Sequence, residues 1–127
     1  MRYVVEPGGE FYRLLLRYAN LFSGMVSQTA ACNASHSVDQ RLARWLLLVH
    51  DRVHRDAFPL THEFMALMLG VRRASVTQAA SALRVAGAIE YRIGHVHVVD
   101  RDVLEQTACG CYAVMRDLGE RIFIRSA

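Results

Sequence analysis

The sequence contains no lysine, so all fifteen of its basic residues are arginines. Arginine stays charged at neutral pH, and its planar fork can hold a phosphate or a carboxylate at two points. The formal net charge of +3 is by itself only a mild indication of a nucleic-acid partner. The distribution of charge says more. The segment from Thr61 to Arg101 contains five arginines and three histidines but only three acidic residues.

Long apolar segments are also absent. No run of about 18 apolar residues occurs, so we expect no membrane span. The first nine residues lack the apolar stretch of a signal peptide, which leads us to expect a cytoplasmic protein. A chain of 127 residues, 53% hydrophobic and 21% charged, suffices for one compact domain with an appendage.

Motifs of the common enzyme classes are missing. The sequence has no nucleophile elbow, Walker loop, dinucleotide-binding glycine pattern or recognisable pair of catalytic carboxylates. Its six histidines form no triad by spacing. We therefore expect no catalytic site.

Cysteine is scarce, with Cys32, Cys109 and Cys111 as the three examples. The Cys-Gly-Cys pair has neither zinc-ribbon nor redox CxxC spacing, and an odd count argues against a disulfide framework. Free cysteine behaves as a small apolar residue, so we expect buried thiols, with a redox switch as the alternative.

One histidine pair has a spacing that can bind metal. His50 and His54 lie one helical turn apart. No third ligand is evident nearby, and the glutamate of a zinc-protease motif is missing. We predict no metal site and assign both histidines to structural or solvated positions.

The segment from Thr61 to Gly87 predicts two helices joined by a tight turn. Thr61 can cap a helix over residues 62–69, because its hydroxyl can accept a bond from a free amide of the first turn. Gly70 then suits a sharp turn in a conformation that disfavours a Cβ atom. A second helix is predicted over residues 73–85.

The spacing of apolar residues divides the second helix into two faces. Met65, Ala66 and Leu69 of the first helix can pack on an aliphatic face of the second, formed by Val76, Ala79, Ala80 and Leu83. Polar groups suited to phosphates and base edges are left outside: Arg72, Arg73, Ser75, Thr77, Gln78 and Ser81. This division is typical of a recognition helix, although an ordinary helical hairpin with a solvated face is the alternative.

Residues 88–99 predict a β-hairpin directly after these helices. Apolar and polar residues alternate over two short segments, with a turn around Gly94. Such a hairpin would make the unit a winged helix-turn-helix. Arg92 and His95 near its tip would then lie beside a phosphate backbone, which Thr61 would touch from the other flank.

Residues from about 36 to 100 resemble the C-terminal DNA-binding half of the Crp/Fnr family of bacterial transcription regulators. The resemblance rests on residues 37–47, 60–61, 68–77, 83–87 and 89. It implies that Arg73 reads a base, because family members place an arginine at this point. They have a glutamate and a second arginine where this sequence has Ala74 and Gln78, so the DNA half-site need not be the usual one; Gln78 would suit an adenine.

Residues 10–31 predict a long amphipathic helix. Apolar residues recur three and four positions apart, as in a paired helix: Phe11, Leu15, Tyr18, Phe22, Met25 and Thr29. The alternative is a single helix that packs on its own domain. The resemblance favours a homodimer, because these regulators dimerise through a helix before the DNA-binding half, and a twofold pair would place two reading helices about 34 Å apart.

The resemblance also implies a β-barrel sensor domain before this helix, which residues 1–9 cannot form. The chain is either a fragment of a longer regulator or a natural protein without the sensor. We expect no cofactor in this chain, while a cyclic nucleotide or another effector would bind a sensor domain if a longer protein carries one. RNA polymerase is a further possible partner.

The remaining segments complete the expected organisation. A polar joint at residues 33–37 precedes a helix over residues 38–53. This helix has an apolar stripe of Val38, Leu42, Trp45, Leu46 and Val49, and Arg41, Arg44 and Arg52 lie off the stripe.

Asp100 can cap a last helix over residues 101–118, which we expect to pack on the Trp45 helix. The apolar tail at residues 121–125 can pack back or extend as a strand. We divide the chain into a flexible lead (1–9), a dimerisation helix and joint (10–35) and the DNA-binding domain (36–127).

Together these features predict a mostly α-helical protein with a small β-hairpin wing. The expected function is that of a homodimeric, sequence-specific DNA-binding transcription regulator whose helix at 73–85 enters the major groove of double-stranded DNA. Alternatives are a winged-helix interaction or dimerisation module and a metal- or redox-controlled switch.

Overall fold

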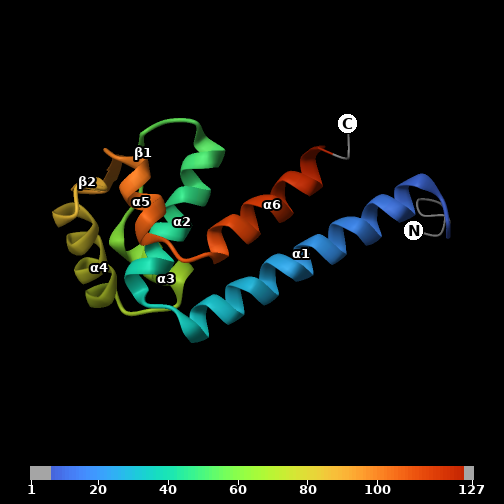
Figure 1. The fold of residues 1–127 in the computed structure, drawn as a ribbon, viewed down its shortest axis with the longest axis horizontal. Coiled ribbons are helices and arrows are strands. Elements are labelled where there is room, and N and C mark those ends of the chain that lie inside the picture. Colours follow the sequence, from blue (N-terminus) through green and yellow to red (C-terminus); the bar gives the residue numbers. More distant parts are fainter. Residues whose placement is uncertain (1–6, 125–127) are drawn as a thin grey trace.

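A computed structural model describes residues 7–124, with side chains described as far as Arg121. Figure 1 shows one long helix that leads into a lobe of shorter helices with a short sheet. The elements, in chain order, are α1 (Glu10–Ser35), α2 (Val38–Val53), β1 (Ala57–Pro59), α3 (His62–Leu69), α4 (Arg73–Val85), β2 (Ile89–Arg92), β3 (His95–Val98), α5 (Arg101–Thr107) and α6 (Cys111–Ile124). The predicted fold class, a winged helix-turn-helix after a long helix, is confirmed.

The first helix is longer than predicted. It continues through Asn33 and Ala34 to Ser35, although the polar character of this stretch suggested a joint. The chain breaks one residue later, because Ser37 forms a capping box with Gln40 and so begins α2. Residues 1–6 of the predicted flexible lead lie outside the described residues.

Helix α2 is the centre of the lobe, and α3, α4 and α5 pack around it. Leu42 and Leu46 of its predicted stripe are fully buried, while Trp45 is partly buried. Burying such side chains is the main favourable term, about 1.5–3 kcal/mol each. The common core includes Met65, Val76, Leu83, Ile89 and Leu104.

Two arginines of α2 are buried although they lie off its apolar stripe. Arg41 and Arg44, expected to lie off the buried stripe, have only 6% and 4% of their surface exposed. Arg41 donates to Asn33 Oδ1 and to the carbonyl oxygen of Leu69, so hydrogen bonds offset its burial. Arg44 is covered because α6 also packs on α2, and it donates to the sulfur of Met115.

The three strands form one antiparallel sheet in the order β1-β3-β2. Phe58 pairs with Val96, and Tyr91 pairs with Val96 from the other side. The turn between β2 and β3 contains Gly94 at φ 78°. The hairpin is therefore the predicted wing, and β1 adds a third short strand beside it.

The predicted single helix over residues 101–118 is instead two helices. Asp100 caps α5 as expected, accepting bonds from the backbone amides of Asp102 and Val103. Ala108 then adopts an extended conformation and ends the helix, and α6 begins at Cys111. Helix α5 packs on α2, but α6 packs mainly along α1, so only part of the expected contact with the Trp45 helix exists.

Helices α1 and α6 lie side by side and extend away from the lobe (Figure 1). Gly24 of α1 permits the close approach, since a Cβ atom there would lie 3.4 Å from Leu118 of α6. The tail predicted to pack back or form a strand is helical as far as Ile124, and Arg125 lies outside the described residues. None of the helices between residues 7 and 124 is long and apolar enough to cross a membrane.

Two glycines give opposite expectations for the same substitution. Gly70 lies at φ 66° with open space around the missing Cβ atom, so Gly70→Ala should destabilise the fold by about 1–2 kcal/mol through backbone conformation alone. Gly119 lies inside α6, also in open space, and Gly119→Ala should stabilise it by up to about 1 kcal/mol. Denaturant unfolding of both variants measures this contrast, and equal effects of the two would contradict the role of Gly70.

Candidate nucleic-acid interface

The turn between α3 and α4 is held by local contacts. Thr61 caps α3 by accepting a hydrogen bond from the Phe64 amide at 3.1 Å, as predicted. Gly70 ends α3 in the left-handed conformation, and the Val71 amide bonds back to Ala66. No side chain caps the start of α4 and no acidic residue lies in its first turn. The Ser75 amide donates to the Arg72 carbonyl oxygen, so the amides of Arg73 and Ala74 are the ones available to an anion such as phosphate.

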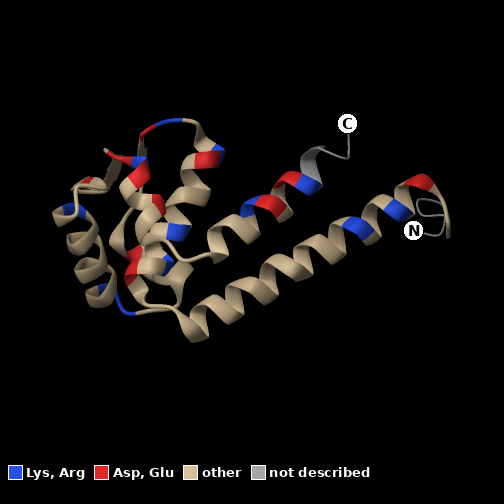
Figure 2. Cartoon of the chain, in the orientation of Figure 1, with Lys and Arg blue, Asp and Glu red and all other residues tan. Residues whose placement is uncertain are grey.

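The two faces of α4 are those the sequence predicts. Val76, Ala79, Ala80 and Leu83 are buried against the lobe. The opposite face is exposed at four of the predicted outward residues on the helix: Arg73, Thr77, Gln78 and Ser81. Arg72 just before the helix is also exposed, whereas Ser75 is half-buried. Figure 2 shows basic residues near both ends of α4 and no acidic residue along it.

Arg73 is exposed and paired across the turn. Its guanidinium donates to Glu63 Oε1 at 3.1 Å, and the two side chains are 66% and 75% exposed. An ion pair in that setting contributes only about 0–1 kcal/mol. The guanidinium can therefore exchange Glu63 for another acceptor at little cost.

His62 is a part of this interface that sequence reasoning missed. Its Nδ1 lies 3.0 Å from the hydroxyl of Thr77, and its ring lies 4.2 Å from that of Tyr91, centroid to centroid. The histidine thus joins α3 to α4 and to β2. Thr77 also donates to the carbonyl oxygen of Arg73, so its hydroxyl is engaged within the protein.

Burial lowers the pKa of His62, and the positive charge of Arg73 lowers it further. The geometry agrees with a neutral ring. Nε2 of His62 is buried without a hydrogen-bond partner, so a proton placed there would meet no acceptor.

The wing places further basic groups beside α4. Arg92 and His95 are exposed on either side of the turn at Gly94, as predicted. Arg84, near the end of α4, lines one shallow groove together with Arg92. Sequence reasoning missed Arg84, although its spacing of eleven residues from Arg73 puts it on the same side of the helix.

The predicted dimer seam on α1 is largely open. Phe11, Leu15, Tyr18 and Phe22 are each about half exposed, and the rings of Tyr18 and Phe22 stack with 6.1 Å between centroids. Met25 and Thr29 are half-buried. Because α6 covers a different side of α1, at Gly24 and Gln28, the seam stays exposed.

The structure also places the histidine pair of α2 and the three cysteines. His50 Nε2 bonds to Asp56 at 2.8 Å, whereas His54 leaves the helix at φ 54°, so the two do not share one helix face. The three cysteines are buried free thiols, as expected. They also converge with His36, a cluster that sequence reasoning missed because its members lie up to 79 positions apart.

Comparisons with known proteins agree on one family. A model described as the Crp-like helix-turn-helix domain matches residues 40–107. A CRP-family transcriptional regulator from Thermus thermophilus has a TM-score of 0.67 and 24% identity, over 83% of this chain and 56% of that one. At this identity the likeness shows the fold alone.

Two further structures are similar. A Crp/Fnr-family transcriptional regulator from Eubacterium rectale has 26% identity and a TM-score of 0.61, over 65% of this chain and 38% of its own. The catabolite activator protein of Thermus thermophilus has 27% identity and a TM-score of 0.52, over 80% of this chain and 44% of its own. The chain thus spans less than two thirds of each of these proteins. The search of curated proteins gives no match.

His62 makes the stability of this interface dependent on pH. Its folded pKa lies below the ordinary value of 6.5, so its contribution is fully present above about pH 6.5 and is lost as the pH falls through the folded pKa. His62→Gln, which can still bond to Thr77, should flatten that part of the profile. Denaturant midpoints of both proteins from pH 5 to 8 test this, and identical slopes would refute it.

Proposed function

The chain belongs to the family of Crp-like helix-turn-helix domains, whose model matches more than half of it, and we propose that it is a sequence-specific DNA-binding transcription regulator. In this proposal it binds double-stranded DNA as a homodimer and inserts α4 into the major groove. It carries out no catalysis and works in the bacterial cytoplasm, where its DNA lies.

One observation carries the proposal most directly. The arginine-led face of α4 points away from the core, while the aliphatic face that holds the helix is buried. A helix of this shape, presented beside a wing, suits the major groove, which is about 12 Å wide. A hairpin built only for stability would not need an uncapped helix start free of acidic residues.

We assign base reading to Arg73 and Gln78. Arg73 can release Glu63 and offer two parallel N–H groups to the O6 and N7 atoms of a guanine. Gln78 lies on the exposed side five positions later and can pair with an adenine. Ala74 supplies no reading group, so the half-site should differ from that of regulators with a glutamate there.

The remaining outward groups serve the backbone of the DNA. Arg72 and Ser81 can hold phosphates directly, and Ser75 and Thr77 assist at the start of α4. Thr77 acts chiefly through its bonds to His62 and Arg73, which fix the helix relative to α3. Thr61, Arg92 and His95 contact the backbone from the flanks, and Arg84 extends the basic surface toward the wing.

We propose that α1 forms the dimer. The half-exposed apolar seam of Phe11, Leu15, Tyr18 and Phe22 is suited to a second copy of the same helix. A twofold pair would set two α4 helices about one DNA turn apart, roughly 34 Å. A sensor domain in a longer protein would then deliver its effector signal through α1, and RNA polymerase would be a partner of the bound dimer.

The same seam favours a second candidate, an assembly module that uses α1 and binds no DNA. Titration of random double-stranded DNA at low salt separates the two candidates. A DNA-binding dimer should show weak affinity that falls steeply with salt, because phosphate contacts release counterions. Absence of any binding at low salt would favour the assembly module.

Arg73→Ala should cost about 1–3 kcal/mol at the preferred site and relax the choice of base at one position. The preferred site is first selected from a random oligonucleotide pool, and affinities are then measured at fixed salt. Arg52→Ala, an exposed change near the end of α2, is the matched control. Unchanged specific affinity for Arg73→Ala would show that this residue reads no base.

Arg92→Ala should weaken binding to all sequences alike. Loss of one phosphate contact in each protomer should reduce the slope of log affinity against log salt by about 0.9 per contact, or about 1.8 for the dimer. Titrations of a selected site and of a random duplex at several salt concentrations measure this slope. A loss confined to the selected site would contradict a backbone role for Arg92.

A further inference from the structure

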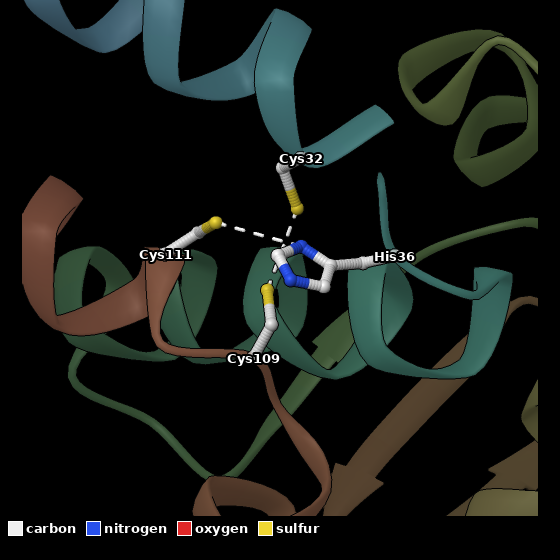
Figure 3. A group of neighbouring side chains, drawn as sticks. All are labelled: Cys32, His36, Cys109 and Cys111. Carbon is white, nitrogen blue, oxygen red and sulfur yellow. Dashed lines mark hydrogen bonds between the residues drawn. The ribbon is translucent and has the colours of Figure 1, made fainter. Parts of the chain in front are cut away.

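Four side chains that can bind metal meet where α1 joins the lobe. The Sγ atoms of Cys32, Cys109 and Cys111 and a ring nitrogen of His36 all lie within 4.8 Å of one another. Figure 3 shows the four side chains pointing toward a common centre. Cys32 lies in the last turn of α1 and His36 caps its end, while Cys109 lies in the break between α5 and α6 and Cys111 begins α6. We propose that these four residues form a tetrahedral Cys₃His site for Zn²⁺.

The distances fit a single metal ion. Zinc binds thiolate sulfur at about 2.3 Å and histidine nitrogen at about 2.0–2.1 Å, so in a tetrahedron two sulfurs lie about 3.8 Å apart and a sulfur and a nitrogen about 3.6 Å apart. Here Cys32 Sγ lies 3.4 Å from Cys109 Sγ, and Cys111 Sγ lies 3.6 Å from His36 Nδ1. A four-iron cluster places iron and sulfide between its ligands and would require wider spacing.

The donor set selects zinc over harder cations. Thiolate and imidazole ligands suit Zn²⁺, whereas Mg²⁺ and Ca²⁺ prefer oxygen. Four protein ligands leave no open position, which is the pattern of structural zinc and not of catalytic zinc. Half-buried His36 provides the route by which the ion reaches the three buried sulfurs.

The surroundings supply a hydrogen bond and a counter-charge. Gln28 Nε2 donates to Cys111 Sγ at 3.1 Å, a contact that stabilises a thiolate ligand. When Zn²⁺ replaces the three thiol protons, the centre carries a net charge of −1. Arg44 lies close enough for its positive charge to act on the sulfurs of Cys32 and Cys111.

The burial of Arg44 supports the same assignment. Arg44 is 4% exposed, its Nε has no hydrogen-bond partner, and no carboxylate in the described part of the chain forms an ion pair with it. A buried cation without a counter-charge is costly. A zinc–thiolate centre beside it supplies the missing negative charge.

The site would join two parts of the chain that are far apart in sequence. Cys32 and His36 lie at the junction of α1 with α2, whereas Cys109 lies in the break between α5 and α6 and Cys111 begins α6. The ion would therefore fix the direction in which α1 and α6 leave the lobe. It also explains why the helix breaks at residues 108–110, since an unbroken helix would turn Cys109 and Cys111 about 200° apart.

Measurement of the zinc content tests the proposal independently of DNA binding. The full chain, purified with zinc and dialysed, should contain about one Zn²⁺ per chain by elemental analysis. Cys109→Ser and His36→Ala should lose most of that zinc, while His36→Cys, which restores four ligands, should keep it. His97→Ala, an exposed histidine on β3, is the control and should retain full occupancy.

Cobalt binding to the unsubstituted chain provides a test that does not depend on how a variant folds. Co²⁺ added to the metal-free chain should give the intense ligand-field bands of a tetrahedral site and thiolate-to-metal charge transfer, which Zn²⁺ should abolish. Gln28→Leu should weaken zinc binding about 10- to 100-fold without changing the stoichiometry. Cys109→Ser and His36→Ala should fail to develop the cobalt spectrum, whereas His36→Cys should still develop it.

Three results would overturn the proposal. One is a folded chain, with native circular dichroism, that binds neither Zn²⁺ nor Co²⁺. Another is iron with acid-labile sulfide, which would indicate a cluster. The third is a Cys32–Cys109 disulfide in protein isolated without oxidant, which the 3.4 Å separation of their sulfurs makes the main competitor.

Discussion

The packing of the inner face of α4 against the lobe determines how the rest of the molecule is presented. Val76, Ala79, Ala80 and Leu83 are almost completely buried, and two of the four are alanines that let neighbouring backbones approach closely. Because this face of α4 is buried, only the opposite face of the helix can point outward. The identity of the residues on that side, led by Arg73, then follows from helical periodicity alone.

A second constraint comes from the centre of α2. This helix buries aliphatic side chains toward α3, α4 and α5, yet it also buries Arg41 and Arg44. Arg41 is held by hydrogen bonds to Asn33 of α1 and to the carbonyl oxygen of Leu69 at the end of α3. Arg44 instead donates to Met115 of α6, and its charge acts on Cys32 of α1 and Cys111 of α6.

The features predictable from the sequence are those set by local chemistry. Thr61, Gly70 and the spacing of aliphatic residues give the bounds of α3 and α4, because caps, left-handed turns and periodicity each act over a few residues. The wing and its turn at Gly94 follow from alternation in the same way.

Features that depend on distant partners were not predictable. The break before Cys111 and the convergence of three cysteines with His36 depend on α6 lying along α1, and the burial of Arg44 depends on α6 packing on α2. His62 was missed for a related reason, since its role comes from Thr77 and Tyr91 on two other elements. A Cys-x₃-His segment and a Cys-x-Cys segment far apart in the chain are weak signals until the fold joins them.

The central claim is that the outer face of α4 and the adjoining wing form the DNA-binding surface. Backbone NMR of the isotope-labelled chain, titrated with a duplex that it binds specifically, tests this claim residue by residue. The account predicts that the largest amide shift changes fall in residues 72–85 and 90–95. Changes confined to α1, with α4 and the wing unaffected, would contradict it.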